Sequence, residues 1–378
     1  MIRSLKISGY KTFDRLELGK LGSLNLFVGK NNTGKTCLLE AVELYASGSP
    51  WDILRVASRR DAESSQYRRL ERHDTFEIGS SAQTLLSLFN RAEGRISKTI
   101  CLSAGHPEAD LRLDCAPFLP DALESEAFNA ESGKLDPPAR RRQLRLLLEE
   151  GFILTRGNRK SRPLIFERYL RRLPSSREII EEEGWLHSDI APVAFLPARG
   201  FSKTESKRLW DKASLADKDD LLLDWLRFIE PEVRDLRYIS DPESGGDVPY
   251  LKSNGDRGRT PLSSMGDGLT RLFHIGLAMA TASGGVLLID EFENGLHWEV
   301  QGQLWKALFE AASRFGVQVF ATTHSSDCIR AFVEAQNARL ISAESCVYRL
   351  DRKGDSVRAQ ELLPLGLEAA FRQGIEVR

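Results

Sequence analysis

Gly29-Lys30-Asn31-Asn32-Thr33-Gly34-Lys35-Thr36 decides how this chain folds. The segment has two glycines separated by four residues and followed by Lys and Thr, which is the pattern of a phosphate-binding loop. Residues 24–28 before it are typical of a buried strand, and residues 37–42 after it are typical of the start of a helix. This context predicts an α/β fold with a nucleotide site, and a plain Gly/Asn turn is the less favoured interpretation.

The motif gives its residues distinct tasks. Its glycines let the backbone wrap around phosphate groups, and its amides and the following helix N-terminus face the negative charge. Lys35 is expected to reach the outer phosphates, and the Thr36 hydroxyl to bind Mg²⁺. The predicted nucleotide contacts in this segment are Gly29, Asn31, Asn32, Thr33, Gly34, Lys35, Thr36 and Cys37.

The composition is that of an ordinary globular protein. Of 378 residues, 41% are hydrophobic and 28% are charged, and the net charge of −1 gives no overall attraction to nucleic acid or anionic lipid. The five cysteines show no CxxC spacing and favour reduced thiols in the cytoplasm over a disulfide or zinc framework. The sequence indicates neither a secretory signal nor a membrane span.

Local patterns divide the chain into a main domain and an insertion. Residues 117–190 are rich in Arg, Glu and Leu and predict an inserted helical subdomain, with helices over 140–150 and 164–173. Elsewhere we expect strands over residues 2–8, 13–18, 96–102, 111–113 and 193–196, and helices over 34–45, 81–90, 217–230 and 269–282.

An apolar strand followed by two acids lies far downstream, at residues 285–291. A fully buried parallel strand has this composition, and open α/β sheets bind ligands at the carboxyl ends of such strands. Asp290 is expected to hold Mg²⁺ directly or through water, and Glu291 to polarise an attacking water. A buried strand with a solvated acidic end is the alternative.

A second apolar strand, residues 317–323, leads to His324. A single His is more often structural, and we interpret His73, His106 and His187 in that way. His324 follows the acidic strand by one helix length, which is the spacing of a neighbouring βαβ unit. We therefore expect it to meet a γ-phosphate at the same edge of the sheet.

A glycine-rich segment, residues 262–268, precedes the apolar helix expected over 269–282. Ser264 is expected to cap that helix, and Gly266 permits close approach of another backbone. A helix N-terminus with a hydroxyl and free amides binds anions. Because this loop cannot easily serve the phosphate loop of its own chain from a separate lobe, it predicts a site shared by two molecules; an ordinary helix cap is the alternative.

In their order along the chain, these motifs resemble those of ABC-type ATPase heads. Three segments resemble the OLD-like branch of prokaryotic AAA ATPases, and RecF and SMC heads are more distant relatives. They are Ser-Met-Gly-Asp-Gly-Leu-x-Arg at 264–271, Asp-Glu-x-Glu-Asn-Gly-Leu-His at 290–297, which contains a D-loop-like stretch, and Phe-Ala-Thr-Thr-His-Ser at 320–325.

The resemblance covers residues 1–100 and 190–378 and implies an ABC-type P-loop ATPase head. Such a head has a mixed sheet flanked by helices and antiparallel N-terminal strands. Its two parts are residues 1–116 and 191–378, around the inserted helical subdomain at 117–190. The resemblance also implies a head-to-tail homodimer that sandwiches two ATP molecules, and larger oligomers remain open.

Within that dimer the resemblance implies catalysis by Lys35, Glu291 and His324, Mg²⁺ binding by Thr36 and Asp290, and contact with the partner's γ-phosphate by Ser264 and Gly266. The signature differs from the usual form because Met265 stands where a glycine is common. The glutamine that senses Mg²⁺ has only Gln66 and Gln83 as candidates, and neither is favoured.

OLD nucleases carry a TOPRIM metal domain after the head, whereas 54 residues follow His324 here. The expectation is a standalone, slow ATPase that senses or gates for a separate effector, such as a nuclease or toxin, in anti-phage defence. A RecF-like repair ATPase is the main alternative, because residues 156–162 and nearby arginines are basic and would bind DNA in a salt-dependent way. A solvated helical face, a transporter subunit and an ATP-controlled scaffold are further interpretations.

Overall fold

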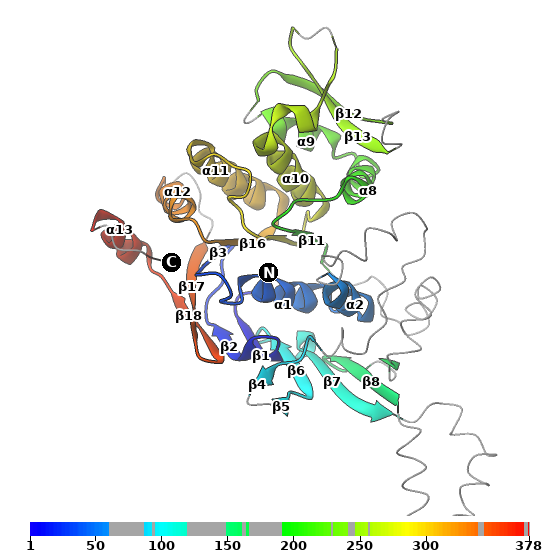
Figure 1. Ribbon diagram of the computed structural model, residues 1–378, viewed down its shortest axis with the longest axis vertical. Coiled ribbons are helices and arrows are strands. Elements are labelled where there is room, and N and C mark those ends of the chain that lie inside the picture. Colours follow the sequence, from blue (N-terminus) through cyan, green and yellow to red (C-terminus); the bar gives the residue numbers. More distant parts are fainter. Residues whose placement is uncertain are drawn as a thin grey trace, which may run out of the picture. The chain divides into compact units, whose positions relative to one another are not determined.

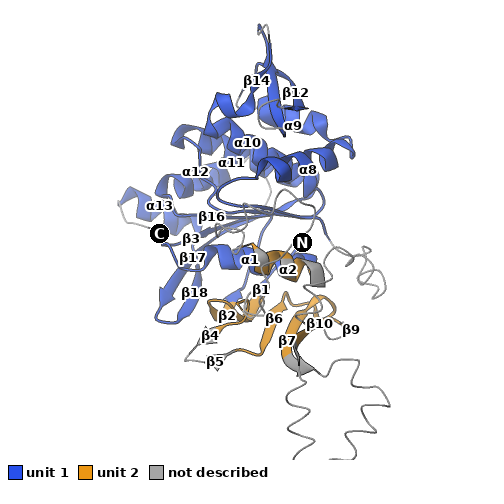
Figure 2. Ribbon diagram, turned by 45° about the vertical axis from the view of Figure 1, so that its right-hand side comes forward, with its two compact units in different colours: residues 1–5, 17–47, 190–378 blue, residues 6–16, 48–189 orange. Residues whose placement is uncertain are grey.

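The computed structural model describes two compact units. The described residues are 1–59, 87–92, 95–118, 149–160, 164–165, 191–227, 230–240, 246–255, 258–338, 344–373 and 377. Unit 1 contains residues 1–5, 17–47 and 190–378, and unit 2 contains residues 6–16 and 48–189 (Figure 2).

A six-stranded mixed sheet forms the middle of unit 1. Its order is β11 (Val193–Leu196), β15 (Val286–Ile289), β16 (Gln318–Thr323), β3 (Leu24–Val28), β17 (Ser345–Lys353) and β18 (Ser356–Glu361). The first five strands run parallel to their neighbours, and β18 is antiparallel to β17. Strands β3, β15 and β16 are buried along their whole lengths, which explains their continuous apolar sequences.

Helices cover both faces of this sheet (Figure 1). On one face lie α10 (Asp267–Thr281), α11 (Trp298–Phe315) and α12 (Ser326–Asn337), and on the other lies α1 (Lys35–Ser47). Unit 1 also contains η6 (Leu262–Met265), α8 (Lys203–Ser214), α9 (Asp219–Arg227), α13 (Pro364–Arg372), and a small sheet of β12 (Val233–Ser240), β13 (Asp247–Ser253) and β14 (Thr260–Pro261). None of the described helices combines the length and the hydropathy needed to cross a bilayer.

A second sheet belongs mainly to unit 2. Its order is β10 (Leu164–Ile165), β8 (Glu149–Arg156), β7 (Leu111–Phe118), β6 (Thr99–Ser103), β1 (Leu5–Tyr10) and β2 (Phe13–Leu18), and β9 (Arg159–Lys160) pairs with β8. Unit 2 also contains α2 (Pro50–Ser58), the 3₁₀ turn η3 (Pro107–Ala109), and the short strands β4 (Arg91–Ala92) and β5 (Arg95–Ile96). The predicted N-terminal strands are β1 and β2, and β1 pairs antiparallel with β6.

Three helix predictions are wrong where the structure describes their residues. Residues 149–150 and 164–165, expected at helix ends, lie in strands β8 and β10, because β8 pairs with β7 over its full length and β10 pairs with β8. Residues 87–90, expected in a helix, instead bond to the β1–β2 turn, and Phe89 forms a bridge with Tyr10. Cross-strand pairing has outweighed local helix propensity at all three places. The rest of the predicted helical insertion, including 140–148 and 166–173, lies outside the described residues and stays a prediction.

Aromatic side chains join the helical face of unit 1 to the end of β15. The ring of Trp305, which is 1% exposed, stacks on Phe292 with centroids 3.8 Å apart and meets the edge of Phe332 at 4.9 Å. These contacts pack α11 against the loop that follows the acidic strand and against α12. The core therefore supports the segment that carries the site acids.

We predict that Trp305→Ala lowers the free energy of unfolding by about 3–5 kcal/mol, because it removes a fully buried ring and leaves a cavity. Trp298→Ala is the matched control: this Trp lies on the same helix, is 60% exposed, and should change stability by less than about 0.5 kcal/mol. Urea unfolding followed by circular dichroism measures both, and equal effects would contradict the packing described.

Candidate functional site

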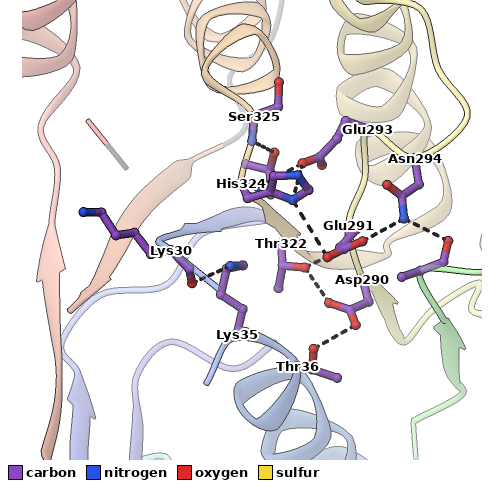
Figure 3. Close-up of polar contacts among 12 residues, drawn as sticks. Lys30, Lys35, Thr36, Asp290, Glu291, Glu293, Asn294, Thr322, His324 and Ser325 are labelled. Atoms are coloured by element: carbon purple, nitrogen blue, oxygen red, sulfur yellow. Dashed lines mark hydrogen bonds and ion pairs between the residues drawn. The ribbon is translucent and has the colours of Figure 1, made fainter. Parts of the chain in front are cut away.

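The phosphate loop connects β3 to α1, as its sequence predicts. It passes so close to β17 that a Cβ atom on Gly29 would lie 2.6 Å from the carbonyl oxygen of Leu350. At its end, Lys35 Nζ donates hydrogen bonds to the carbonyl oxygens of Gly29 (2.7 Å) and Lys30 (2.9 Å) (Figure 3). The Lys35 side chain therefore lies across the loop that is expected to hold phosphate.

The other predicted phosphate contacts belong to the same turn. Asn31 and Asn32 are exposed, whereas Thr33 is buried and its hydroxyl donates to the Lys30 carbonyl at 2.9 Å. Helix α1 begins directly after Gly34, with Lys35, Thr36 and Cys37 in its first turn. N–H groups in a first turn do not take part in the helix ladder, so they can face an anion.

Asp290 lies at the carboxyl end of β15, opposite the start of α1. Its carboxylate accepts hydrogen bonds from the hydroxyls of Thr36 (2.9 Å) and Thr322 (2.6 Å). Asp290 is 7% exposed, and this burial raises its pKa. A carboxylate and a hydroxyl are oxygen ligands of the kind that Mg²⁺ prefers, and a cation here would offset the cost of burying the charge.

The donor set fits a nucleotide-bound Mg²⁺. Among the described residues, no group of three or more His, Cys, Asp or Glu side chains could hold a metal ion. Mg²⁺ at phosphate sites normally takes only one or two protein ligands and completes its shell with phosphate and water. The pair of Thr36 and Asp290 meets that requirement.

Glu291 and His324 meet at the adjacent ends of β15 and β16. Glu291 has a left-handed backbone (φ 46°), and its N–H donates to the Thr322 hydroxyl at 2.9 Å. The Nδ1 atom of His324 lies 3.8 Å from Glu291 Oε1 and 3.1 Å from Glu293 Oε1 (Figure 3). The backbone N–H of His324 also donates to Glu293 Oε1 at 2.9 Å. The structure thus brings together the two residues predicted to act on water and γ-phosphate.

Arg271 is a site residue to which sequence reasoning gave no role. It is 4% exposed on α10, and its guanidinium donates to the carbonyls of Asp290 (2.8 Å), Glu291 (2.9 Å), Pro197 (2.8 Å) and Ala198 (3.3 Å). Burial lowers its pKa to about 10, so it remains charged at neutral pH. An arginine within an apolar helix was the available signal, since buried arginines need several acceptors.

Burial also lowers the pKa of Lys35, against the opposing influence of Glu291, Asp290 and Glu293. The Lys35 ammonium group is therefore within electrostatic range of the three acids that follow β15, although its hydrogen bonds are to the phosphate loop. The site thus places a cation that can neutralise phosphate charge within electrostatic range of Asp290, the carboxylate that can hold a divalent cation.

The prediction that Ser264 caps α10 is wrong. Residues 262–265 form η6, and the N-cap is Gly266, whose φ of 97° and ψ of 161° suit glycine. The helix therefore starts at Asp267, two residues earlier than expected. Ser264 and Gly266 are exposed, and within the described residues neither forms a hydrogen bond with residues 29–36. Their contact with the γ-phosphate bound by a second copy stays a prediction.

The D-loop-like stretch lies beside this segment. A Cβ atom on Gly295 would meet the carbonyl oxygen of Asp267 at 3.3 Å. His106 is exposed, and its interpretation as a structural residue stays a prediction. The glutamine candidates Gln66 and Gln83, and also His73 and His187, lie outside the described residues.

Comparison with known proteins identifies relatives of the chain. Residues 24–327 match the AAA_21 family, described as "AAA domain, putative AbiEii toxin, Type IV TA system". An "ATP/GTP phosphatase" of Helicobacter pylori (strain ATCC 700392 / 26695) is 22% identical over 347 residues, which are 87% of this chain and 86% of the relative.

Solved SMC heads also align with most of the chain. The SMC head domain from Thermotoga maritima has a TM-score of 0.45 and 11% identity, and the alignment covers 96% of this chain and 98% of that one. The Smc head with an extended coiled coil, bound to the C-terminal domain of ScpA and derived from Pyrococcus furiosus, has a TM-score of 0.48 and 11% identity, with 98% of both chains covered.

His274 on α10 gives a prediction about pH. Its Nδ1 accepts a hydrogen bond from the Phe201 N–H at 3.3 Å, and burial, with a smaller contribution from Arg271, lowers its pKa to about 4. The unfolded chain binds a proton near pH 6.5 and the folded chain only near pH 4. Neutral His274 therefore makes its full contribution to the free energy of unfolding above pH 6.5. About 3 kcal/mol of that free energy is lost as the pH falls from 6.5 to 4.

Urea unfolding between pH 7 and pH 4.5 measures this loss. His274→Asn keeps an acceptor near the Phe201 N–H. It should lower the slope of the free energy of unfolding against pH by the equivalent of about one proton. His106→Asn, at an exposed position, should leave that slope as in the wild type. An unchanged slope in His274→Asn would contradict the assignment.

Proposed function

The chain belongs to the AAA_21 family and is an ATPase with an ABC-type head, and we propose that two copies close head to tail around ATP and open again after hydrolysis. One observation carries the proposal. Lys35, Thr36, Asp290, Glu291 and His324 converge at one edge of the sheet, whereas Ser264 and Gly266 face solvent at the start of α10. A second copy supplies the half of the pocket that those two residues form.

Each side chain has a task that suits its position. Lys35 and the amides of the α1 first turn neutralise and hold the phosphates, while Thr36 and Asp290 hold Mg²⁺, which supplies further charge neutralisation. Glu291 accepts the proton of the attacking water as general base. His324, beside it, contacts the γ-phosphate. Ser264 and Gly266 of the second copy complete the contacts on that phosphate.

The reaction transfers the γ-phosphoryl group of ATP to water. Such a transfer depends on positioning and charge neutralisation more than on covalent chemistry. In the closed dimer the pocket excludes bulk water from the phosphates. Hydrolysis removes the group that both copies hold, so the copies separate. Turnover is slow because the rate depends on closing and opening.

The opening and closing gate a separate effector, a nuclease or a toxin, in anti-phage defence. The family description names a putative toxin and a type IV toxin–antitoxin system, which supports the link of this ATPase to a toxin. The described residues after His324 extend the ATPase sheet with β17 and β18 and add α12 and α13. In this proposal the effector chemistry belongs to a separate protein. Membership of the OLD-like branch and the cytoplasmic location are parts of the same proposal.

A RecF-like role in DNA repair stays an alternative prediction. Of the basic segment that suggested it, Arg159 is exposed in the structure, whereas residues 161–163 and 166–172 lie outside the described residues. A steep loss of DNA binding with salt, removed by changing Arg159 and Lys160, would favour it over the gate.

Glu291→Gln tests the mechanism. Removal of the general base should lower ATP hydrolysis by about 10²–10⁴-fold while ATP still binds, so ATP should trap a dimer that light scattering detects. Glu310→Gln, at an exposed position of α11, is the control and should behave as the wild type. Undiminished hydrolysis, or a variant that stays monomeric with ATP, would count against the proposal.

A further inference from the structure

Resting on the proposed role of Glu291 as base, we infer that Asn294 is a positioning residue that fixes the Glu291 carboxylate for water activation. Asn294 lies three residues after Glu291, in the loop between β15 and α11. Its Nδ2 donates to Glu291 Oε2 at 2.8 Å and to the Ala198 carbonyl oxygen at 3.3 Å (Figure 3).

The orientation of the Asn294 amide follows from its partners. Both the Glu291 carboxylate and the Ala198 carbonyl are acceptors, so the amide group that faces them must be the NH₂. An oxygen in that place would be repelled by both. The side chain therefore acts as a double donor that joins the acid to the turn after β11.

The backbone around Asn294 is held as firmly as its side chain. The Asn294 N–H donates to the Glu291 carbonyl at 3.1 Å, and the Leu296 N–H donates to the Glu293 carbonyl at 2.9 Å. The Glu293 carboxylate accepts the backbone N–H of His324 and so ties this loop to the end of β16. Asn294 is consequently presented from an anchored turn, and its contact with Glu291 is built into the fold.

The contact gives the two oxygens of the Glu291 carboxylate different surroundings. Oε2 is occupied by Asn294, which leaves Oε1 directed towards His324, 3.8 Å from its Nδ1. The Glu291 side chain is one-third exposed. Without Asn294, rotation about the outer two side-chain bonds of Glu291 would be free to turn its carboxylate into solvent. The Asn294 bond thus selects the rotamer in which one oxygen can accept a proton from water beside His324.

The effect should appear in kcat. A hydrogen bond to a charged group contributes enough that its loss from the transition state slows the reaction about 10- to 100-fold. Asn294 forms no described hydrogen bond with residues 29–36, so KM for ATP should stay within about twofold of the wild-type value. Asn294→Asp keeps the shape of the side chain but replaces the donor by an acceptor, so it should not restore activity.

Steady-state ATPase assays on wild type, Asn294→Ala and Asn294→Asp test the inference, with binding of a fluorescent ATP analogue and thermal unfolding measured alongside. Asn337→Ala is the control, because Asn337 also donates its Nδ2 to a glutamate, Glu368, but in an exposed bond that involves none of the site acids. It should keep wild-type kcat. We expect both Asn294 variants to lose kcat and retain ATP binding.

Two results would overturn the inference: wild-type kcat in Asn294→Ala, or recovery of kcat in Asn294→Asp, which would show that shape alone is required. Asn294→Asp, as the near-isosteric variant, decides the question if Asn294→Ala does not fold. Glu291→Gln is assayed in parallel. If Glu291→Gln also hydrolyses ATP normally, the proposed function itself fails; if it is inactive while Asn294→Ala is fully active, only the role of Asn294 fails.

Discussion

The parallel pairing of β16 with both β15 and β3 is the constraint on which the site depends. Its register sets Ile289 opposite Ala321 and Val28 opposite Thr323, so all three strands end at one edge of the sheet. A slip of one residue would turn every side chain of a strand to the opposite face. Thr322 would then lose Asp290, and the phosphate loop would no longer face the acids. The backbone hydrogen bonds between these strands thus determine where the catalytic side chains lie.

Buried charges at this edge support one another. Burial disfavours the charged forms of Lys35, Asp290 and Arg271, and each lies close to groups of opposite sign or to carbonyl oxygens that offset part of that cost. Removal of one of these three side chains leaves the buried charges of the others without a partner. The protein is then destabilised by more than the net contribution of any single charge pair. The residues therefore behave as a unit, and the described geometry couples α10, the end of β15 and the start of α1.

The parts of the site that could be predicted are those in which a motif coincides with a buried strand. Lys35, Asp290 and His324 each follow an apolar run, so sheet topology brings them together. The cap at Ser264 was wrong because the conformation of Gly266 depends on η6, which has no strong sequence signature. Strand β8 was missed because its pairing with β7 is non-local, whereas helix propensity is local. Contacts such as that of Asn294 with Ala198 join residues 96 positions apart and leave no periodic pattern.

The chain leaves unit 1 after Ser47 and returns at Ile190. Every strand of the six-stranded sheet, and every residue of the acid cluster, comes from outside that interval. Residues 48–189 can therefore change in length or sequence without altering any backbone pairing of the six-stranded sheet. A different partner could therefore be recognised through this interval while the residues that act on ATP keep their positions.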